Sequence, residues 1–248
     1  EGWSFIKTYS LVRPDVYDAI ADEAHKRGLG LFGHVPEAVS LAQAVSKGHG
    51  IVEHFGRLTI ACSTNEPAIV SRRLSGMAGA KTLADIMVVL RETHPLALKD
   101  HDEKLCSEAF ERLKINGTWV MPSLIVADFY MGRDPAENDP RMQSIPLSVR
   151  SKWKENDFRR GQQTENEKLS AVEGVKIEYG VFKKAHKAGV KFLAGTDAGY
   201  INPYIFHGFS IHDELERYVE NGMTPAEALA TATVNPSAYL GETKEAGR

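Results

Sequence analysis

Four polar side chains, each at the end of a separate apolar segment, together have the composition of a divalent-metal site. They are Lys7, His34, His54 and Asp197. Neutral imidazoles and carboxylates are ligands that suit Zn²⁺ and related ions. Lysine is the unusual member of the set, because a buried ammonium without a partner is costly. If the fold brings these segment ends together, metal-dependent chemistry is what the four residues predict.

Each of the four also has an ordinary structural interpretation. Either histidine could hydrogen-bond a backbone carbonyl at a strand end, and Asp197 could be a turn residue or a helix cap. Lys7 could extend to solvent from a strand edge. The set is more specific than any of its members, because four such residues at four separate strand ends are hard to obtain by chance.

The segments that must position these side chains alternate between strand and helix. Apolar strands are predicted at 5–9, 29–33 and 51–53. The helix between the first two begins at Pro14, where a first helical turn tolerates proline, and ends at Gly28. This βαβαβ order is typical of a parallel sheet.

The rest of the chain continues the pattern with interruptions. Further helices are predicted at 83–91, 102–114 and 165–187, further strands at 118–126 and 190–194, and a capping box at 224–227. Residues from about 126 to 164 are polar and rich in proline, which predicts a long loop or lid insertion within a single domain covering 1–248.

Five strands alternating with helices fit either a doubly wound open sheet or part of a (β/α)₈ barrel. In both folds the functional groups gather at the C-terminal ends of the strands. No glycine-rich phosphate loop follows any of the predicted strands, which counts against a nucleotide-binding open sheet.

Composition excludes several classes of partner. The net charge is −3 and no run of Lys and Arg occurs, so we expect no nucleic acid. No apolar stretch approaches the roughly 20 residues of a membrane span, so we expect no membrane.

Cys62 and Cys106 are too few for a disulfide framework, and we expect two buried thiols. The chain enters a strand almost at once and lacks an initial Met; we expect it to begin inside a longer protein, and no compartment is predicted.

Motifs around the four candidate residues resemble the amidohydrolase superfamily, above all its imidazolonepropionase-like and Xaa-Pro dipeptidase-like branch. The motifs are Phe5-Ile6-Lys7-Thr8-Tyr9, Gly33-His34-Val35, Val52-Glu53-His54 and Ala194-Gly195-Thr196-Asp197-Ala198-Gly199. The tail from His207-Gly208 to Asn235-Pro236 resembles the same branch. The resemblance is dense at both ends of the chain and sparse between 60 and 160.

This resemblance implies the C-terminal portion of a (β/α)₈ TIM barrel, with strands 4 to 8 and their helices present and the N-terminal strands missing. Lys7 would lie on the fourth strand, His34 on the fifth, His54 on the sixth and Asp197 on the eighth. It also implies two divalent metal ions, Zn²⁺ being favoured, with Lys7 carboxylated as the bridging ligand. Asp197 would be both a metal ligand and the catalytic proton carrier.

Two further residues are candidates for substrate binding. Tyr9 lies two positions past Lys7 and is expected on the same face of the strand, although a tyrosine at the rim of the core is the alternative. His207 follows the eighth-strand loop and is expected to contact substrate or orient Asp197, a helix-cap role being the alternative.

The implied function is a metal-dependent hydrolase that cleaves a C–N bond in an amide, cyclic amide or dipeptide through a metal-bridging hydroxide. Alternatives are an esterase, lactonase or organophosphate hydrolase with the same site, or a non-catalytic barrel fragment. The sequence contains no His-x-His pair, which the family carries on its first strand, and we expect that pair upstream of Glu1. The partner would be a small amide or peptide substrate, and a homo-oligomer is left open.

Overall fold

A computed structural model describes residues 2–130, 139–156, 165–199 and 203–247 of the chain. The chain divides into two compact units, and each is described by itself. The first comprises Glu1–Met121 and Val181–Phe192, and the second comprises Pro122–Gly180 and Leu193–Arg248.

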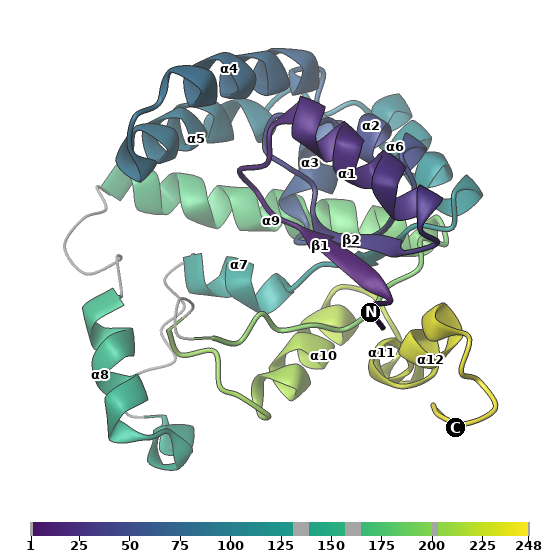
Figure 1. The fold of residues 1–248 in the computed structure, drawn as a ribbon. Coiled ribbons are helices and arrows are strands. Elements are labelled where there is room, and N and C mark those ends of the chain that lie inside the picture. The colour runs from purple at the N-terminus through teal and green to yellow at the C-terminus, as the bar shows by residue number, and fades with distance from the viewer. Residues whose placement is uncertain (1, 131–138, 157–164, 200–202, 248) are drawn as a thin grey trace. The chain divides into compact units, whose positions relative to one another are not determined.

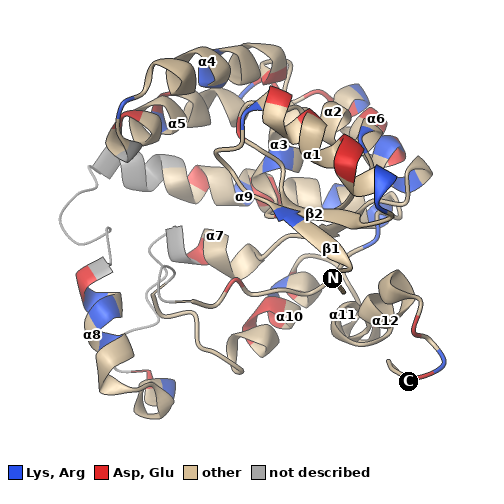
Figure 2. Cartoon of the chain, in the orientation of Figure 1, with Lys and Arg blue, Asp and Glu red and all other residues tan. Residues whose placement is uncertain are grey.

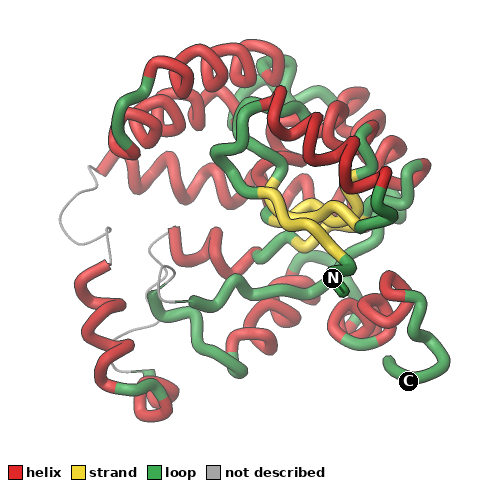
Figure 3. Tube along the Cα trace, in the orientation of Figure 1, coloured by secondary structure: helices red, strands yellow, loops and turns green. Residues whose placement is uncertain are grey.

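The first unit alternates strands and helices and then becomes helical (Figure 1). Its elements are β1 (Phe5–Thr8), α1 (Pro14–Lys26), β2 (Gly30–His34), α2 (Leu41–Ser46), β3 (His49–Glu53), α3 (Gly56–Ala61), α4 (Glu66–Gly79), α5 (Leu83–Ala97), α6 (Glu103–Ile115) and β4 (Trp119–Met121). Figure 3 shows the strands of this unit gathered together, with helices beside them.

The four strands form one parallel sheet in the order β1-β2-β3-β4. Thr8 pairs with Gly33 and His34 pairs with Glu53, so the C-terminal ends of the first three strands lie along one edge of the sheet. The predicted α/β class with a parallel sheet is therefore confirmed.

The predicted strands at 118–126 and 190–194 are wrong in extent. β4 ends at Met121, because Pro122 follows it and Ser123 adopts a left-handed φ of +50° that an extended strand cannot continue. In the segment 190–194, Phe192 forms a single parallel bridge to Val120 and no strand develops among the described residues.

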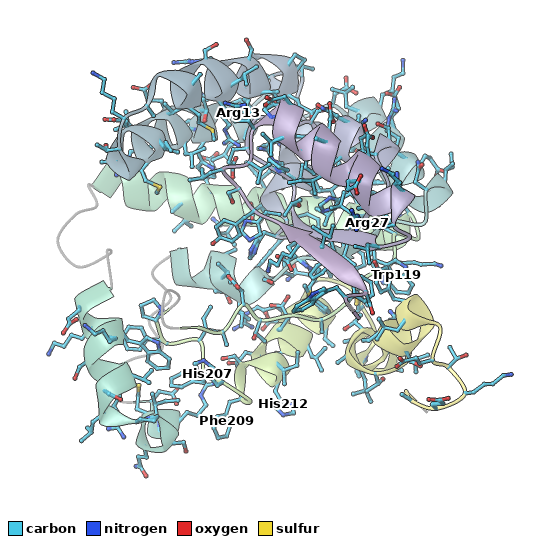
Figure 4. The ribbon with its side chains drawn as sticks, viewed as in Figure 1. Arg13, Arg27, Trp119, His207, Phe209 and His212 are labelled. Atoms are coloured by element: carbon cyan, nitrogen blue, oxygen red, sulfur yellow. A yellow bond between two sulfur atoms is a disulfide. The ribbon has the colours of Figure 1, made fainter. Side chains whose placement is uncertain are left out.

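Helix α1 packs beside the sheet. Tyr17, Ala21 and Ala24 are buried, whereas Val16 is 41% exposed. Arg13 and Arg27 are the residues that cap its two ends (Figure 4). Basic and acidic residues are mixed along α6, whereas α1 carries four acidic residues ahead of a single Lys26 in its last turn (Figure 2).

Between β3 and α6 the chain forms three helices, α3, α4 and α5. Helices α4 and α5 form a hairpin (Figure 1), and Gly76 permits their close approach, since a Cβ at that position would lie 2.6 Å from Val89 Cγ2. Thr82 and Asp85 form a capping box at the start of α5.

Cys62 and Cys106 form a disulfide, so the expectation of two free thiols is wrong. Cys62 ends α3 and Cys106 lies in α6, and their Cα atoms are 4.4 Å apart. Asp102, the N-cap of α6, donates its backbone N–H to the carbonyl of Cys62 at 2.9 Å, which brings the two helices together at this point. A separation of 44 residues gives no sign of this pairing in the sequence.

The second unit is helical among its described residues. Its elements are α7 (Leu124–Tyr130), the 3₁₀ helix η1 (Pro140–Ser144), α8 (Leu147–Asn156), α9 (Glu165–Lys187, as far as Gly180), α10 (Ser210–Glu220), α11 (Pro225–Ala232) and α12 (Val234–Leu240). Trp153 is fully buried against Ile145, Tyr204 and Phe206.

The predictions for this unit have mixed outcomes. The helix at 165–187 and the capping box of Thr224 and Glu227 are confirmed. The described part of the expected loop at 126–164 contains helix instead, while 131–138 and 157–164 lie outside the described residues. None of the helices in the described ranges combines the length and apolar character needed to cross a bilayer.

Candidate metal centre

Side chains at the ends of β1, β2 and β3 meet in what we call the strand-end cluster, which consists of Lys7, His34, Glu53 and His54. His34 Nε2 lies 3.0 Å from His54 Nε2 and 3.7 Å from Glu53 Oε2. The same oxygen of Glu53 lies 2.8 Å from Lys7 Nζ. The structure thus brings together three of the four residues that the sequence singled out for metal binding, and adds a carboxylate.

The backbone at the strand ends leaves the extended conformation at two positions. Gly33 has a φ of +116°, and a Cβ there would lie 2.5 Å from the carbonyl oxygen of Thr8, so no side chain fits. His54 has a φ of +61°. Successive residues of a strand point to opposite faces, so this left-handed turn is what lets His54 share the cluster with Glu53, the residue before it.

Three consecutive residues at the exit of β1 hold His34. Thr8 Oγ1 donates to the carbonyl of His34 at 2.9 Å, and the Tyr9 ring stacks on the imidazole with centroids 4.3 Å apart. Ser10 Oγ lies 2.6 Å from His34 Nδ1. Nδ1 of His34 is therefore occupied by the Ser10 hydroxyl, and Nε2 is the nitrogen that faces the strand-end cluster.

The electrostatic surroundings of His34 favour its neutral form. Burial, followed by the nearby His54 and Lys7, lowers the pKa of His34 to about 3. A neutral imidazole offers a lone pair, which is the form that binds a metal ion.

Glu53 is the member of the cluster that the sequence analysis did not select. Its side chain is only 7% exposed, whereas that of Lys7 is 47% exposed. A carboxylate inside an otherwise apolar strand, directly before a candidate ligand, was the available signal. The alternation of side chains along a strand argued against selecting Glu53, because Glu53 and His54 would normally face opposite sides of the sheet.

His49 is a buried histidine next to the strand-end cluster. It begins β3 and is fully buried, with Tyr17 Oη 3.0 Å from Nδ1 and the carbonyl of Gly33 3.1 Å from Nε2. Because a carbonyl can only accept, Nε2 donates to Gly33 and Nδ1 accepts from the tyrosine. Burial lowers the pKa of His49 to about 4. His49 therefore supports the backbone next to His34.

Asp197 and His207 belong to the second unit. Asp197 is exposed and has a φ of +51° in the segment after Phe192. His207, labelled in Figure 4, is exposed and lies parallel to the Trp153 ring, with an interplanar angle of 2° and centroids 6.4 Å apart. Tyr9, the other substrate-binding candidate, is 56% exposed on top of His34.

The donor set of the strand-end cluster fits a divalent ion. One ligand atom from each of His34, Glu53 and His54 can be chosen so that all lie within 4.8 Å of one another. Zn–N and Zn–O bonds of about 2.0–2.2 Å in a tetrahedron place ligand atoms roughly 3.3 Å apart. Two imidazoles with one carboxylate are also a common composition for zinc.

A parallel α/β sheet with this residue set at its strand ends defines a class of candidate metalloenzymes, and sequence comparison gives the family. The model of the amidohydrolase family matches residues 12–248. The chain belongs to the amidohydrolase family. No curated protein matches it with significance.

Solved structures with the same fold are longer than this chain. A bottromycin amidohydrolase superposes with a TM-score of 0.65 at 23% identity, and the alignment covers 97% of this chain and 47% of that one. A Xaa-Pro dipeptidase with bound methionine gives 0.53 at 19% identity, covering 99% and 46%. A putative prolidase from Bifidobacterium longum gives 0.51 at 18% identity, covering 99% and 47%. The chain thus spans about half the length of these proteins.

Proposed function

We propose that this chain forms part of a metal-dependent hydrolase that cleaves a C–N bond in an amide, a cyclic amide or a dipeptide. The observation that carries the proposal is the strand-end cluster, in which an amine, two imidazoles and a carboxylate meet at three neighbouring strand ends of an amidohydrolase-family protein. Membership of the family supports the hydrolysis of amide bonds, and the cluster supports metal dependence.

The proposed architecture is a partial (β/α)₈ barrel. β1, β2, β3 and β4 would be its fourth to seventh strands, and the segment at 190–194 would take the position of the eighth. The parallel order of the four strands and the bridge from Val120 to Phe192 support this assignment. In such barrels the functional residues lie at the C-terminal ends of the strands, as Lys7, His34 and His54 do here.

The proposed cofactor is a pair of divalent ions, with Lys7, His34, His54 and Asp197 among the ligands and Lys7 carboxylated so that it bridges the ions. When bound, such ions lower the pKa of a bridging water enough to give hydroxide at neutral pH, and they polarise the substrate carbonyl. Zn²⁺ is the favoured ion because imidazole and carboxylate ligands suit it.

In this proposal the protein supplies proton transfer and substrate contacts. Asp197, assigned from its Gly195-Thr196-Asp197 motif, accepts a proton during attack and delivers it to the leaving nitrogen. Tyr9 is exposed above His34, where its hydroxyl can meet a substrate, and His207 is the second candidate contact.

The test is a substrate panel assayed on the full polypeptide with added Zn²⁺ or Mn²⁺. The panel contains Xaa-Pro and other dipeptides, N-acyl amino acids, cyclic imides, esters, lactones and phosphotriesters. We expect amide hydrolysis that a chelator abolishes and that Asp197→Asn reduces by about 10²- to 10⁴-fold, the range for loss of a general acid–base group.

Asp22→Asn is the matched control, because Asp22 is an exposed aspartate of the first unit that pairs with Lys47. It should leave turnover unchanged. Hydrolysis of esters or phosphotriesters without amide hydrolysis would contradict the proposed bond type. Near-normal turnover in Asp197→Asn would contradict the proton-transfer role alone.

A further inference from the structure

We propose that Glu37 is a positioning residue for the imidazoles of both His34 and His54, and that the α4–α5 hairpin holds Glu37 in place through Arg73. Glu37 follows His34 by three residues and lies outside the strand-end cluster. The inference rests on the proposed function only for its effect on metal binding, because the placement of the two rings can be measured in the metal-free chain.

The backbone of Glu37 is tied to the residue that orients His34. Glu37 donates its N–H to the carbonyl of Ser10 at 2.8 Å. The hydroxyl of Ser10 in turn lies 2.6 Å from His34 Nδ1. A shift of Glu37 would therefore move the hydroxyl that fixes the His34 ring.

The side chain of Glu37 is tied to the helix that follows His54. Arg57 lies in α3, three residues after His54, and donates from Nη2 to Glu37 Oε2 at 3.1 Å and to the carbonyl of Pro36 at 2.7 Å. Its side chain is 6% exposed, and its Nη1 is buried with no hydrogen-bond partner in the described part of the chain. Arg57 therefore locks the segment after His34 to the start of α3.

The α4–α5 hairpin supplies a second guanidinium group to Glu37. Arg73 of α4 donates from Nη1 to the same Oε2 of Glu37, and from Nε to Thr93 Oγ1 of α5 at 2.9 Å. Thr93 donates onward to the carbonyl of Val89 at 2.9 Å, so the chain of bonds ends in the backbone of α5. We call Glu37, Arg57, Arg73 and Thr93 the Glu37 network.

The hairpin can support Glu37 because its base is closed. Ser63 Oγ donates to the carbonyl of Lys99 at 2.7 Å, and the N–H of Thr64 donates to the carbonyl of Asp100 at 3.1 Å. Both ends of the α4–α5 excursion are therefore attached just beyond α3, the helix that carries Arg57.

The chemistry of the Glu37 network favours positioning over stability. Replacing a buried ion pair by well-packed apolar side chains is often neutral or stabilising, so such a pair is a weak device for stability. Hydrogen bonds between ionised groups are strong and directional. Two guanidinium groups on one carboxylate oxygen thus hold the segment after His34 in one place.

The experiment compares wild type with Glu37→Gln, which keeps the size of the side chain but removes the charge that holds the two arginines. NMR spectra of the histidine side chains in the metal-free chain report the placement of each ring. We expect the signals of both His34 and His54 to shift. Zn²⁺ affinity, measured by competition with a chromophoric chelator, should fall about 10- to 100-fold, the range for loss of groups that orient metal ligands.

Asp139→Asn is the matched control. Asp139 is a 16% exposed carboxylate of the second unit that pairs with Arg141 at 2.8 Å. Its loss also breaks a partly buried ion pair, but it should leave the ring signals and the Zn²⁺ affinity at their wild-type values.

Thr93→Val tests the far end of the Glu37 network with less risk to folding. Valine keeps the size of the side chain but removes the acceptor for Arg73, so the same signals should shift by a smaller amount. Thr93→Ser keeps the hydroxyl and should restore the wild-type signals. In a double mutant with Glu37→Gln, Thr93→Val should add nothing, because it acts through that carboxylate.

Three results would overturn the proposal. The first is unchanged ring signals in Glu37→Gln or, if circular dichroism shows that this variant does not fold, in Thr93→Val. The second is an equal shift in Asp139→Asn, which would trace the effect to a general loss of stability. The third is wild-type Zn²⁺ affinity despite shifted rings. The proposed function is rejected separately, by the absence of metal-dependent hydrolysis in the full polypeptide.

Discussion

Two buried glutamates, one in each unit, have their charge satisfied in different ways. Glu53 in the first unit is paired with the half-exposed side chain of Lys7. Glu214 in the second unit is fully buried and accepts from the backbone N–H groups of Leu124 and Ile125 at 2.8 and 2.9 Å, at the start of α7. The partner of Glu53 can be replaced without unfolding anything, but the partners of Glu214 are part of a helix.

The difference separates a candidate site from a structural anchor. Both residues are carboxylates at low exposure, so burial alone does not identify function. A carboxylate held by an exchangeable cation can accept a metal ion, whereas one held by fixed amide donors determines where a helix begins. Four perturbations test this distinction.

Gly33→Ala should have the largest effect, and the structural change that it causes should be confined to the strand-end cluster. The added Cβ would meet the carbonyl of Thr8 at 2.5 Å, and the φ of +116° is unfavourable for alanine. Backbone strain and overpacking of about 1–3 kcal/mol each predict a loss of about 4 kcal/mol in unfolding free energy, with weaker Zn²⁺ binding. Urea unfolding and chelator competition measure the two effects. Gly117→Ala is the control, since its φ is also positive but no atom lies within 4 Å of the added carbon.

Glu214→Ala should come next and should leave the cluster untouched. Two backbone N–H groups would lose their acceptor in a buried setting, which costs about 1–3 kcal/mol for each group and predicts a loss of about 3 kcal/mol. Hydrogen exchange should accelerate at Leu124 and Ile125, while Zn²⁺ affinity stays at the wild-type value. A tenfold or larger change in Zn²⁺ affinity would remove the distinction between the two glutamates.

The two units should respond to pH with opposite signs. Burial lowers the pKa of His49 from 6.5 to about 4, so the unfolded state binds the proton more tightly and the stability of the first unit falls as pH drops from 6.5 to 4. Burial raises the pKa of Glu214 from 4.5 to about 7, so the folded state binds the proton more tightly and the stability of the second unit falls as pH rises from 4.5 to 7. Each effect is on the order of 3 kcal/mol.

Hydrogen exchange measured from pH 4.5 to 7.5 and corrected for intrinsic rates resolves these two slopes. Protection of β3 should increase with pH, and protection at the start of α7 should decrease. His49→Gln should flatten the first slope alone. Parallel slopes in both units would contradict the assignment of each titration to its own residue.

Ser10→Ala should have the smallest effect of the four. The hydroxyl beside His34 Nδ1 orients the ring without being a ligand, and loss of such a partner weakens metal binding about tenfold, or about 1.4 kcal/mol. Ser10→Thr should restore the affinity, and Ser46→Ala, whose hydroxyl bonds only within α2, should not change it. In a double mutant with His34→Ala, Ser10→Ala should add nothing, because it acts through that ring.

Much of the fold and part of the site could be predicted from the sequence. The alternation of apolar segments with Pro- and Gly-bounded helices located β1, β2, β3 and α1, and the helix predicted at 102–114 corresponds to α6. Strand ends are marked by local patterns, so the positions of Lys7, His34 and His54 could be predicted without knowledge of distant contacts.

The features that were missed depend on contacts far apart in the chain or on backbone angles. Glu53 and His54 share the cluster because His54 turns left-handed, which no periodicity predicts. β4 ends early because Ser123 adopts a left-handed φ, and α7 then begins where Glu214, about 90 positions later, accepts from its first amides. The pairing of Cys62 with Cys106 likewise depends on the packing of α3 on α6.

The disulfide makes a covalent ring of everything between α3 and α6. The α4–α5 hairpin lies within this 44-residue span, so a protease that cuts the hairpin opens the ring without dividing the molecule. The nicked chain should run as one species on a denaturing gel until a reductant separates it into two. The segment C-terminal to such a cut would remain attached to α3 through the disulfide. Because α3 begins directly after His54, this segment would stay close to the imidazoles of the strand-end cluster.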